Sequence, residues 1–191
     1  MGKMVFVVDM INGFCKKGAL ANPKNMEMVP LLHDFLENFE GDKVEARDWH
    51  TEDSLEFREY PIHSLMDDFE SEGIDELKDV LAGARVFHKN STNLAVVPGF
   101  IDYILEKKPE SITITGCCTD ICIMQYALTL KALFNQYNID CEIIVYDNLV
   151  NTFDSPDHNR EYYQEAALNF MRNAGITIKH YEKNKVIKKV N

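Results

Sequence analysis

The chain has 191 residues, of which 46% are hydrophobic, and it carries a formal net charge of -11. This length and composition fit one ordinary domain with a single buried core, which we place over residues 1–191. Nucleic acids and anionic membrane surfaces would repel so acidic a chain, so we expect neither as a partner.

The N-terminal residues and the cysteines both favour a cytoplasmic protein. The first apolar run, residues 4–8, is too short for a signal peptide and no small-residue cleavage site follows it. No apolar stretch approaches the roughly 18 residues that suggest a membrane span. The cysteine count is odd and three of the five crowd into residues 117–122, which favours reduced thiols over a disulfide framework.

Short apolar, β-branched runs alternate with segments of helical period along the chain. In chain order we expect a strand at 3–8, a helix at 23–39, a strand at 43–47, a helix at 73–81, a strand at 84–88, a helix at 97–107, a strand at 111–115, a helix at 119–136, a strand at 141–146, a helix at 157–173 and a strand at 175–179. This order predicts an α/β three-layer sandwich around a mainly parallel six-stranded sheet. Residues 50–72 form the longest irregular stretch, and 179–189 read as a solvated basic tail.

Reactive side chains follow four of the expected strands. They are Asp9 after the first strand, Asp48 and His50 after the second, Lys89 after the third, and Cys118 to Cys122 after the fourth. Ligands of open α/β sheets bind outside the carboxyl ends of the strands. The pattern therefore predicts one site at that edge of the sheet.

The segment from Thr115 to Cys122 is the candidate nucleophile segment, because it runs from a strand through a glycine turn into a helix beginning near Thr119. Cys122 then falls in the first helical turn, where unpaired N–H groups and the helix dipole favour a thiolate and can hold an oxyanion. A lone helical cysteine is otherwise an ordinary small buried residue. The strand-turn-helix context favours the nucleophile.

Asp48, His50 and His63 place a carboxylate and two imidazoles on one loop. This ligand set suits zinc, iron or manganese. The alternative is a polar loop with incidental surface histidines.

Three segments carry a family resemblance: Val7-Val8-Asp9-Met10-x-Asn12-x-Phe14, Phe87-His88-Lys89 and Thr115-Gly116-x-x-Thr119-Asp120-x-Cys122. They resemble the motifs of the isochorismatase-like cysteine hydrolases, especially the nicotinamidase/pyrazinamidase branch. The order of elements also matches to the C-terminus, so the resemblance covers nearly the whole chain. It implies a catalytic triad of Asp9, Lys89 and Cys122, an oxyanion hole from the backbone N–H groups of Cys118 and Cys122, and a cis peptide between Cys117 and Cys118.

The resemblance assigns a separate task to each member of the triad. The Lys89 charge favours the Cys122 thiolate, while Asp9 accepts the thiol proton and passes it to the leaving amine. Attack on a carboxamide then gives a thioester. Without the resemblance, Asp9 is as readily a turn residue and Lys89 is better read as a solvated strand end.

In nicotinamidases, an Asp-x-His and a later Pro-x-His supply metal ligands, which correspond here to Asp48, His50 and His63. Glu56 matches a fourth carboxylate ligand of some members, in competition with Glu52, Asp53 and Glu59. The resemblance thus implies one divalent metal ion, with zinc the first expectation and iron or manganese the alternatives.

The resemblance also places two aromatic residues, Phe14 and Tyr60, against a flat substrate ring. The chain departs from the branch at 64–68 and at 90–95, both beside the expected pocket, so these departures bear on the substrate and leave the triad intact. We expect His158 to be a capping or packing residue.

The first interpretation is a metal-dependent nicotinamidase that acts on a small-molecule amide and releases nicotinate and ammonia. One alternative is a related cysteine hydrolase for another small amide or a carbamoyl compound. Another is a noncatalytic small-molecule binding protein on the same fold. The resemblance further implies a homo-oligomer, although no interface can be read from the sequence.

Overall fold

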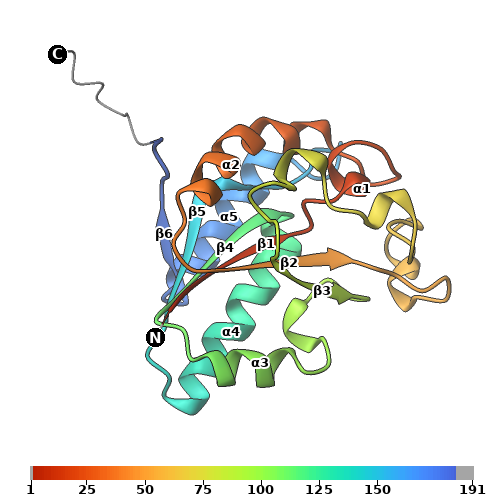
Figure 1. Cartoon of the computed structure of the whole chain (residues 1–191). Coiled ribbons are helices and arrows are strands. Elements are labelled where there is room, and N and C mark those ends of the chain that lie inside the picture. The colour runs from red at the N-terminus through yellow and green to blue at the C-terminus, as the bar shows by residue number, and fades with distance from the viewer. Residues whose placement is uncertain (1, 184–191) are drawn as a thin grey trace.

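The computed structural model describes residues 2–183, and a single parallel sheet lies at its centre. The strands are β1 (Lys3–Val8), β2 (Asp42–Asp48), β3 (Arg85–Lys89), β4 (Ser111–Cys117), β5 (Glu142–Asn151) and β6 (Thr177–Lys179). They lie in the order β3-β2-β1-β4-β5-β6, and every neighbouring pair is parallel (Figure 1). The predicted six-stranded α/β fold is confirmed.

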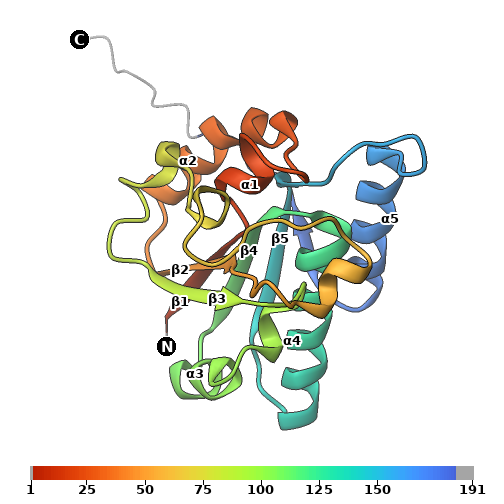
Figure 2. The same cartoon turned by 90° about the vertical axis from the view of Figure 1, so that its right-hand side faces the viewer.

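Helices cover both faces of the sheet, in three layers. They are α1 (Asn12–Cys15), α2 (Val29–Glu37), α3 (Phe100–Lys107), α4 (Met124–Tyr137) and α5 (Arg160–Asn173). Figure 2 shows α1 and α2 above the sheet and α3 and α4 below it. Alternate residues of β1 enter the two cores: Val5 and Val7 pack with α1 and α2, whereas Phe6 packs with α3, α4 and α5.

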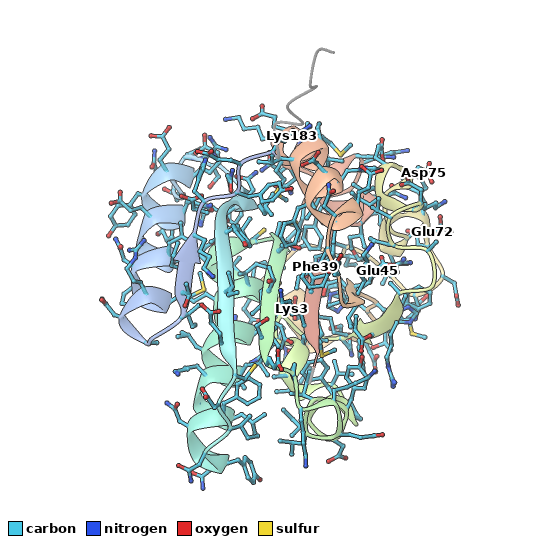
Figure 3. All side chains as sticks on the ribbon, turned by 60° about the vertical axis from the view of Figure 1, so that its left-hand side comes forward. Lys3, Phe39, Glu45, Glu72, Asp75 and Lys183 are labelled. Carbon is cyan, nitrogen blue, oxygen red and sulfur yellow. The ribbon has the colours of Figure 1, made fainter. Side chains whose placement is uncertain are left out.

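Two of the expected helices differ from the structure. The helix expected at 73–81 is wrong: the segment forms turns and a short 3-10 helix, Asp75–Leu77. Ile74, Leu77 and Leu81 are buried, which produced the helical period, but an isolated bridge between Ile11 and Gly73 ties the segment to the end of β1. The labelled side chains of Glu72 and Asp75 point outward here (Figure 3).

The helix expected at 23–39 begins as a 3-10 helix, Pro23–Met28, and becomes α2 only at Val29. Pro30 supplies no N–H group, so it suits the first turn of α2 and opposes a continuous helix through that point. Of the basic tail expected at 179–189, the part from 184 onward lies outside the described residues. Within residues 2–183, none of the helices combines the length and apolar character that a membrane crossing requires.

The carboxyl ends of four neighbouring strands, β1 to β4, lie together at one end of the sheet. Asp48 and Lys89 are paired partners at the ends of β2 and β3, and Val8 pairs with Gly116 between β1 and β4. Gly116 has a φ of +108°, and a Cβ atom there would lie 2.0 Å from the Val8 carbonyl oxygen. Only glycine therefore lets β4 approach β1 so closely just before the candidate nucleophile.

Candidate active site

A buried cluster of opposite charges lies where β1, β2 and β3 end. Lys89 Nζ lies 2.8 Å from Asp9 Oδ2, contacts Asp48 Oδ1, and lies 3.8 Å from Cys122 Sγ. Asp9 Oδ1 also accepts a hydrogen bond from the Asp48 backbone N–H at 3.0 Å. The fold therefore brings the three residues of the expected triad together around one ammonium group.

Lys89 and Asp48 stabilise each other's charged forms inside the protein. Burial by itself lowers the pKa of Lys89, but Asp48, Asp9 and Cys122 outweigh burial and raise that pKa well above its usual value. Burial by itself raises the pKa of Asp48, but Lys89 and the two neighbouring histidines hold it well below its usual range. A buried ammonium and carboxylate persist because each compensates the other's lost hydration.

Asp9 and Cys122 differ from this pair, because burial dominates their proton affinity. Burial and the nearby Asp48 carboxylate raise the pKa of Asp9 to about 7, against the opposing effect of Lys89. Burial likewise raises the pKa of the Cys122 thiol well above its usual value, and Lys89 only partly offsets this. These directions favour a protonated Cys122 thiol, with Asp9 as a base suited to accept its proton near neutral pH.

The turn after β4 presents Cys122 to the site. The peptide bond between Cys117 and Cys118 is cis, as the family resemblance implied. A π-helical turn, Thr119–Ile123, follows and continues directly into α4, so Cys122 lies in the first turn of a helical segment. The oxyanion hole formed by the N–H groups of Cys118 and Cys122 stays a prediction.

Four side chains beside the triad converge as a metal-type cluster: Asp48, His50, Glu56 and His63. One ligand atom from each lies within 4.8 Å of all the others. His50 Nε2 is 3.6 Å from Asp48 Oδ1 and 3.8 Å from Glu56 Oε1, and this buried nitrogen has no hydrogen-bond partner. Two imidazoles and two carboxylates around an unpartnered nitrogen fit a divalent zinc, iron or manganese ion.

Hydrogen bonds outside this cluster orient both imidazoles. His50 Nδ1 donates to Asn90 Oδ1 at 2.9 Å, and His63 Nδ1 donates to the Pro61 carbonyl oxygen at 2.8 Å. Each ring therefore turns its Nε2 inward, as metal-ligating histidines do. No local pattern in the sequence indicates the Asn90 role, since the contact joins residues forty positions apart.

A cavity of about 250 Å³ opens onto both the candidate nucleophile, Cys122, and the metal-type cluster. Cys118 and Cys122 line it, together with the expected aromatic residues Phe14 and Tyr60 and with Asp48, Glu56 and His63. Asp9 and Lys89 do not line the cavity and are fully buried nearby.

Other lining residues were missed in the sequence: Ala19, Leu20, Ala21, Asn22, Asn25, Thr92, Ile121, Phe153 and Asp154. Most of these lie between α1 and α2 or directly after β5, in segments without a chemical motif.

Comparison with known proteins supports one family for the whole chain. The isochorismatase domain family matches residues 3–182. Nicotinamidase 1 of Arabidopsis thaliana is 26% identical over 177 residues, which cover 80% of this chain and 70% of that protein.

Solved structures extend the comparison. N-carbamoylsarcosine amidase from Thermoplasma acidophilum is 27% identical with a TM-score of 0.74, over 94% of this chain and 96% of that one. The pyrazinamidase of Pyrococcus horikoshii, solved in complex with zinc, shares the fold at 22% identity with a TM-score of 0.75, over 94% of this chain and 99% of that one. The chain belongs to the isochorismatase family of hydrolases.

Proposed function

We propose that this protein is a metal-dependent nicotinamidase, which hydrolyses nicotinamide to nicotinate and ammonia through a thioester on Cys122. One observation carries the proposal: a single small cavity is lined by the Cys122 nucleophile, by aromatic rings and by members of a metal-type cluster. The similarity to the plant nicotinamidase is a second support.

The charge of the cavity favours an uncharged amide over a substrate that carries a carboxylate. Among the described residues that line it, three are carboxylates, Asp48, Glu56 and Asp154, and none is lysine or arginine. An anionic substrate would find no basic side chain to pair with, and Asp154 adds a like charge outside the proposed metal ligands. Nicotinamide is neutral, whereas a carbamoyl amino acid carries a carboxylate.

In the first half of the proposed reaction, Asp9 takes the proton of the Cys122 thiol as Sγ attacks the carboxamide carbon. The resulting oxyanion is stabilised by the proposed N–H donors of Cys118 and Cys122. Asp9 then returns the proton to the amide nitrogen, the C–N bond breaks, and ammonia leaves a thioester on Cys122. Lys89 stays charged throughout and stabilises the anionic sulfur at 3.8 Å.

In the second half, a water molecule attacks the thioester carbon while Asp9 accepts its proton. The C–S bond breaks, the proton held by Asp9 returns to Cys122 Sγ, and the nicotinic acid formed loses its carboxyl proton to solvent and leaves as nicotinate. Asp9 thus acts as base and acid in turn, which its pKa of about 7 permits.

The metal-type cluster fits a divalent ion, and we propose that Asp48, His50, Glu56 and His63 bind one, with zinc the first expectation. When bound, this ion supplies a Lewis acid for the ring nitrogen of the substrate or for water. The chain's own contribution is orientation: Asn90 and the Pro61 carbonyl orient the two imidazoles.

The five free cysteines are consistent with the cytoplasm as the proposed compartment.

The test is ammonia release from nicotinamide by the purified protein loaded with zinc, iron(II) or manganese(II). Matched samples are Cys122→Ala and the parent protein after chelation. We expect release by the loaded parent and loss of release in both matched samples. No release from a protein shown by elemental analysis to hold metal would reject nicotinamide as the substrate.

A second candidate is a related amidohydrolase for a carbamoyl compound, because N-carbamoylsarcosine amidase is 27% identical over 94% of this chain. N-carbamoylsarcosine in the same assay separates the two candidates. Ammonia from that compound and none from nicotinamide would favour the second. If neither is cleaved and substrate-sized amides do not slow alkylation of Cys122, a noncatalytic protein is favoured.

A further inference from the structure

Asp120 and His158 form a nearly buried pair beside the nucleophile, although the proposed reaction uses neither. His158 Nε2 lies 2.7 Å from Asp120 Oδ2, and the two side chains are only 12% and 11% exposed. Asp120 belongs to the same π-helical turn as Cys122, whereas His158 lies in the segment between β5 and α5. The pair therefore joins the nucleophile turn to a distant part of the chain.

The segment that His158 holds is a wall of the substrate cavity. Residues 152–158 follow β5, and Phe153 and Asp154 of this segment line the cavity. Thr152 Oγ1 donates a second hydrogen bond to Asp120, at 2.5 Å from Oδ1. We call residues 152–158 the wall segment; both of its ends are bonded to one carboxylate.

Aromatic stacking and hydrogen bonds hold the ring of His158 in place. It stacks between Phe153, with ring centroids 3.9 Å apart, and Tyr163, at 3.8 Å. Its Nδ1 donates to the Phe153 carbonyl oxygen at 3.0 Å, and its backbone pairs with that of Ser155. His158 is the packing residue that the sequence indicated, but what it packs against is the cavity wall.

We propose that Asp120 and His158 are positioning residues that hold the wall segment, and with it Phe153 and Asp154, against the nucleophile turn. The substrate then meets an aromatic surface and a carboxylate at fixed places relative to Cys122. Neither residue touches the reacting atoms, so the pair sets substrate binding rather than the chemical step. This inference rests on the proposed function only for the identity of the substrate.

The variants separate the stacking of His158 from its hydrogen bonds. His158→Phe keeps an aromatic ring between Phe153 and Tyr163 and removes both ring hydrogen bonds. Asp120→Ala removes the shared acceptor. Asp120→Asn is the conservative variant, because its Oδ1 still accepts from Thr152 and its amide N–H can donate to a neutral His158 ring.

His33→Phe is the matched control. His33 Nε2 lies 3.0 Å from Asp79 Oδ2 on the surface, the two side chains are 31% and 71% exposed, and neither residue lines the cavity. The substitution His33→Phe removes a histidine–aspartate pair with a similar N–O distance and leaves the wall segment unchanged.

The first readout is steady-state ammonia release from nicotinamide. We expect His158→Phe and Asp120→Ala to raise KM about tenfold with kcat within about twofold of the parent, since lost binding contacts act on KM. Asp120→Asn and His33→Phe keep both constants within about twofold. A KM for His158→Phe equal to that of His33→Phe, or a kcat that falls as much as KM rises, would overturn the proposal.

The second readout needs no turnover. Cys122 is alkylated with a small reagent, iodoacetamide, and with a bulky one, N-pyrenylmaleimide, and each cysteine is followed by peptide mass spectrometry. We expect His158→Phe and Asp120→Ala to raise the bulky-to-small rate ratio about tenfold, because the wall no longer narrows the cavity. An unchanged ratio would overturn the proposal even if nicotinamide proves not to be the substrate; silence toward nicotinamide with a raised ratio would reject only the proposed function.

Discussion

The strand-end cluster of Asp9, Asp48 and Lys89 and the metal-type cluster share Asp48, yet they are completed in different ways. In the strand-end cluster a single ammonium group lies against two carboxylates: it compensates the charge of Asp48, while the pKa of Asp9 is raised to about 7. In the metal-type cluster the nearest ligand atoms stand 3.6 to 3.8 Å apart and His50 Nε2 has no partner. The strand-end cluster finds its ionic partners within the protein. In the metal-type cluster, His50 Nε2 gains a partner only when an ion binds.

The strand-end cluster therefore contributes to the stability of the fold, whereas the metal-type cluster is arranged to bind an ion. Buried opposite charges cost several kcal/mol when one partner is removed, because the other is left without compensation. Hydrogen bonds that orient metal ligands have a different effect. When such a hydrogen bond is removed, the protein binds the metal more weakly but stays folded. Substitutions in the two clusters should therefore have different effects on stability, activity and metal binding.

Cys122→Ala should lower kcat by about 10⁴-fold or more, because the thioester route needs the sulfur atom. The free energy of unfolding should change little by comparison, since the charged partners of Lys89 remain. Activity is measured by ammonia release and stability by urea unfolding. Cys141→Ala, at a buried cysteine away from the cavity, is the control and should retain activity. Equal losses in both variants would remove Cys122 from the role of nucleophile.

Lys89→Met should lower the free energy of unfolding by about 3–5 kcal/mol, because Asp9 and Asp48 would remain buried without their cation. Urea unfolding followed by circular dichroism measures the change. Lys107→Met is the matched control: Lys107 lies 2.7 Å from Asp42, but the side chains are 44% and 52% exposed. An exposed pair of this kind contributes about 0–1 kcal/mol. If the two variants lose the same stability, burial is not what makes the strand-end cluster costly to break.

Chelation of the loaded protein should lower its free energy of unfolding by about 2.7 kcal/mol when free metal had been held at 100 times its Kd. The reason is that the ion binds the folded cluster and not the separated ligands. Differential scanning calorimetry with and without chelator measures the shift. His63→Ala, which deletes one ligand, should show a much smaller response. A parent protein indifferent to both metal and chelator would contradict the assignment of the metal-type cluster.

Asn90→Ala should weaken metal binding by about 10- to 100-fold while the ligands themselves stay in place, because the hydrogen bond that orients His50 is lost. Competition with a chromogenic chelator measures the affinity. Asn169→Ala, at an exposed position on α5, serves as control and should bind metal as the parent does. An affinity for Asn90→Ala equal to that control would show that packing, or Ser54 with its Oγ 3.4 Å from His50 Nδ1, is enough to orient the ring.

The fold class and the strand-end cluster follow from the order of residues along the chain. Apolar runs alternating with helical segments require a parallel sheet, and parallel strands bring their carboxyl ends to one edge whatever their loops do. Asp9 directly follows β1, Lys89 ends β3 and Cys122 lies in the helical turn after β4, so their proximity followed from position in the chain. The family resemblance added their roles and the metal ligands.

The contacts made through loops and the protonation of the buried groups depend on how the whole chain packs. Glu56 joins the cluster, and Glu52, Asp53 and Glu59 do not, because the 3-10 helix Leu55–Arg58 turns that one side chain inward. The segment 73–81 has helical spacing yet no α-helix, because contacts with the end of β1 outweigh its local preference. The protonation of Cys122 depends on burial, which is a sum over neighbours distant in the chain and has no signature in the residues beside it.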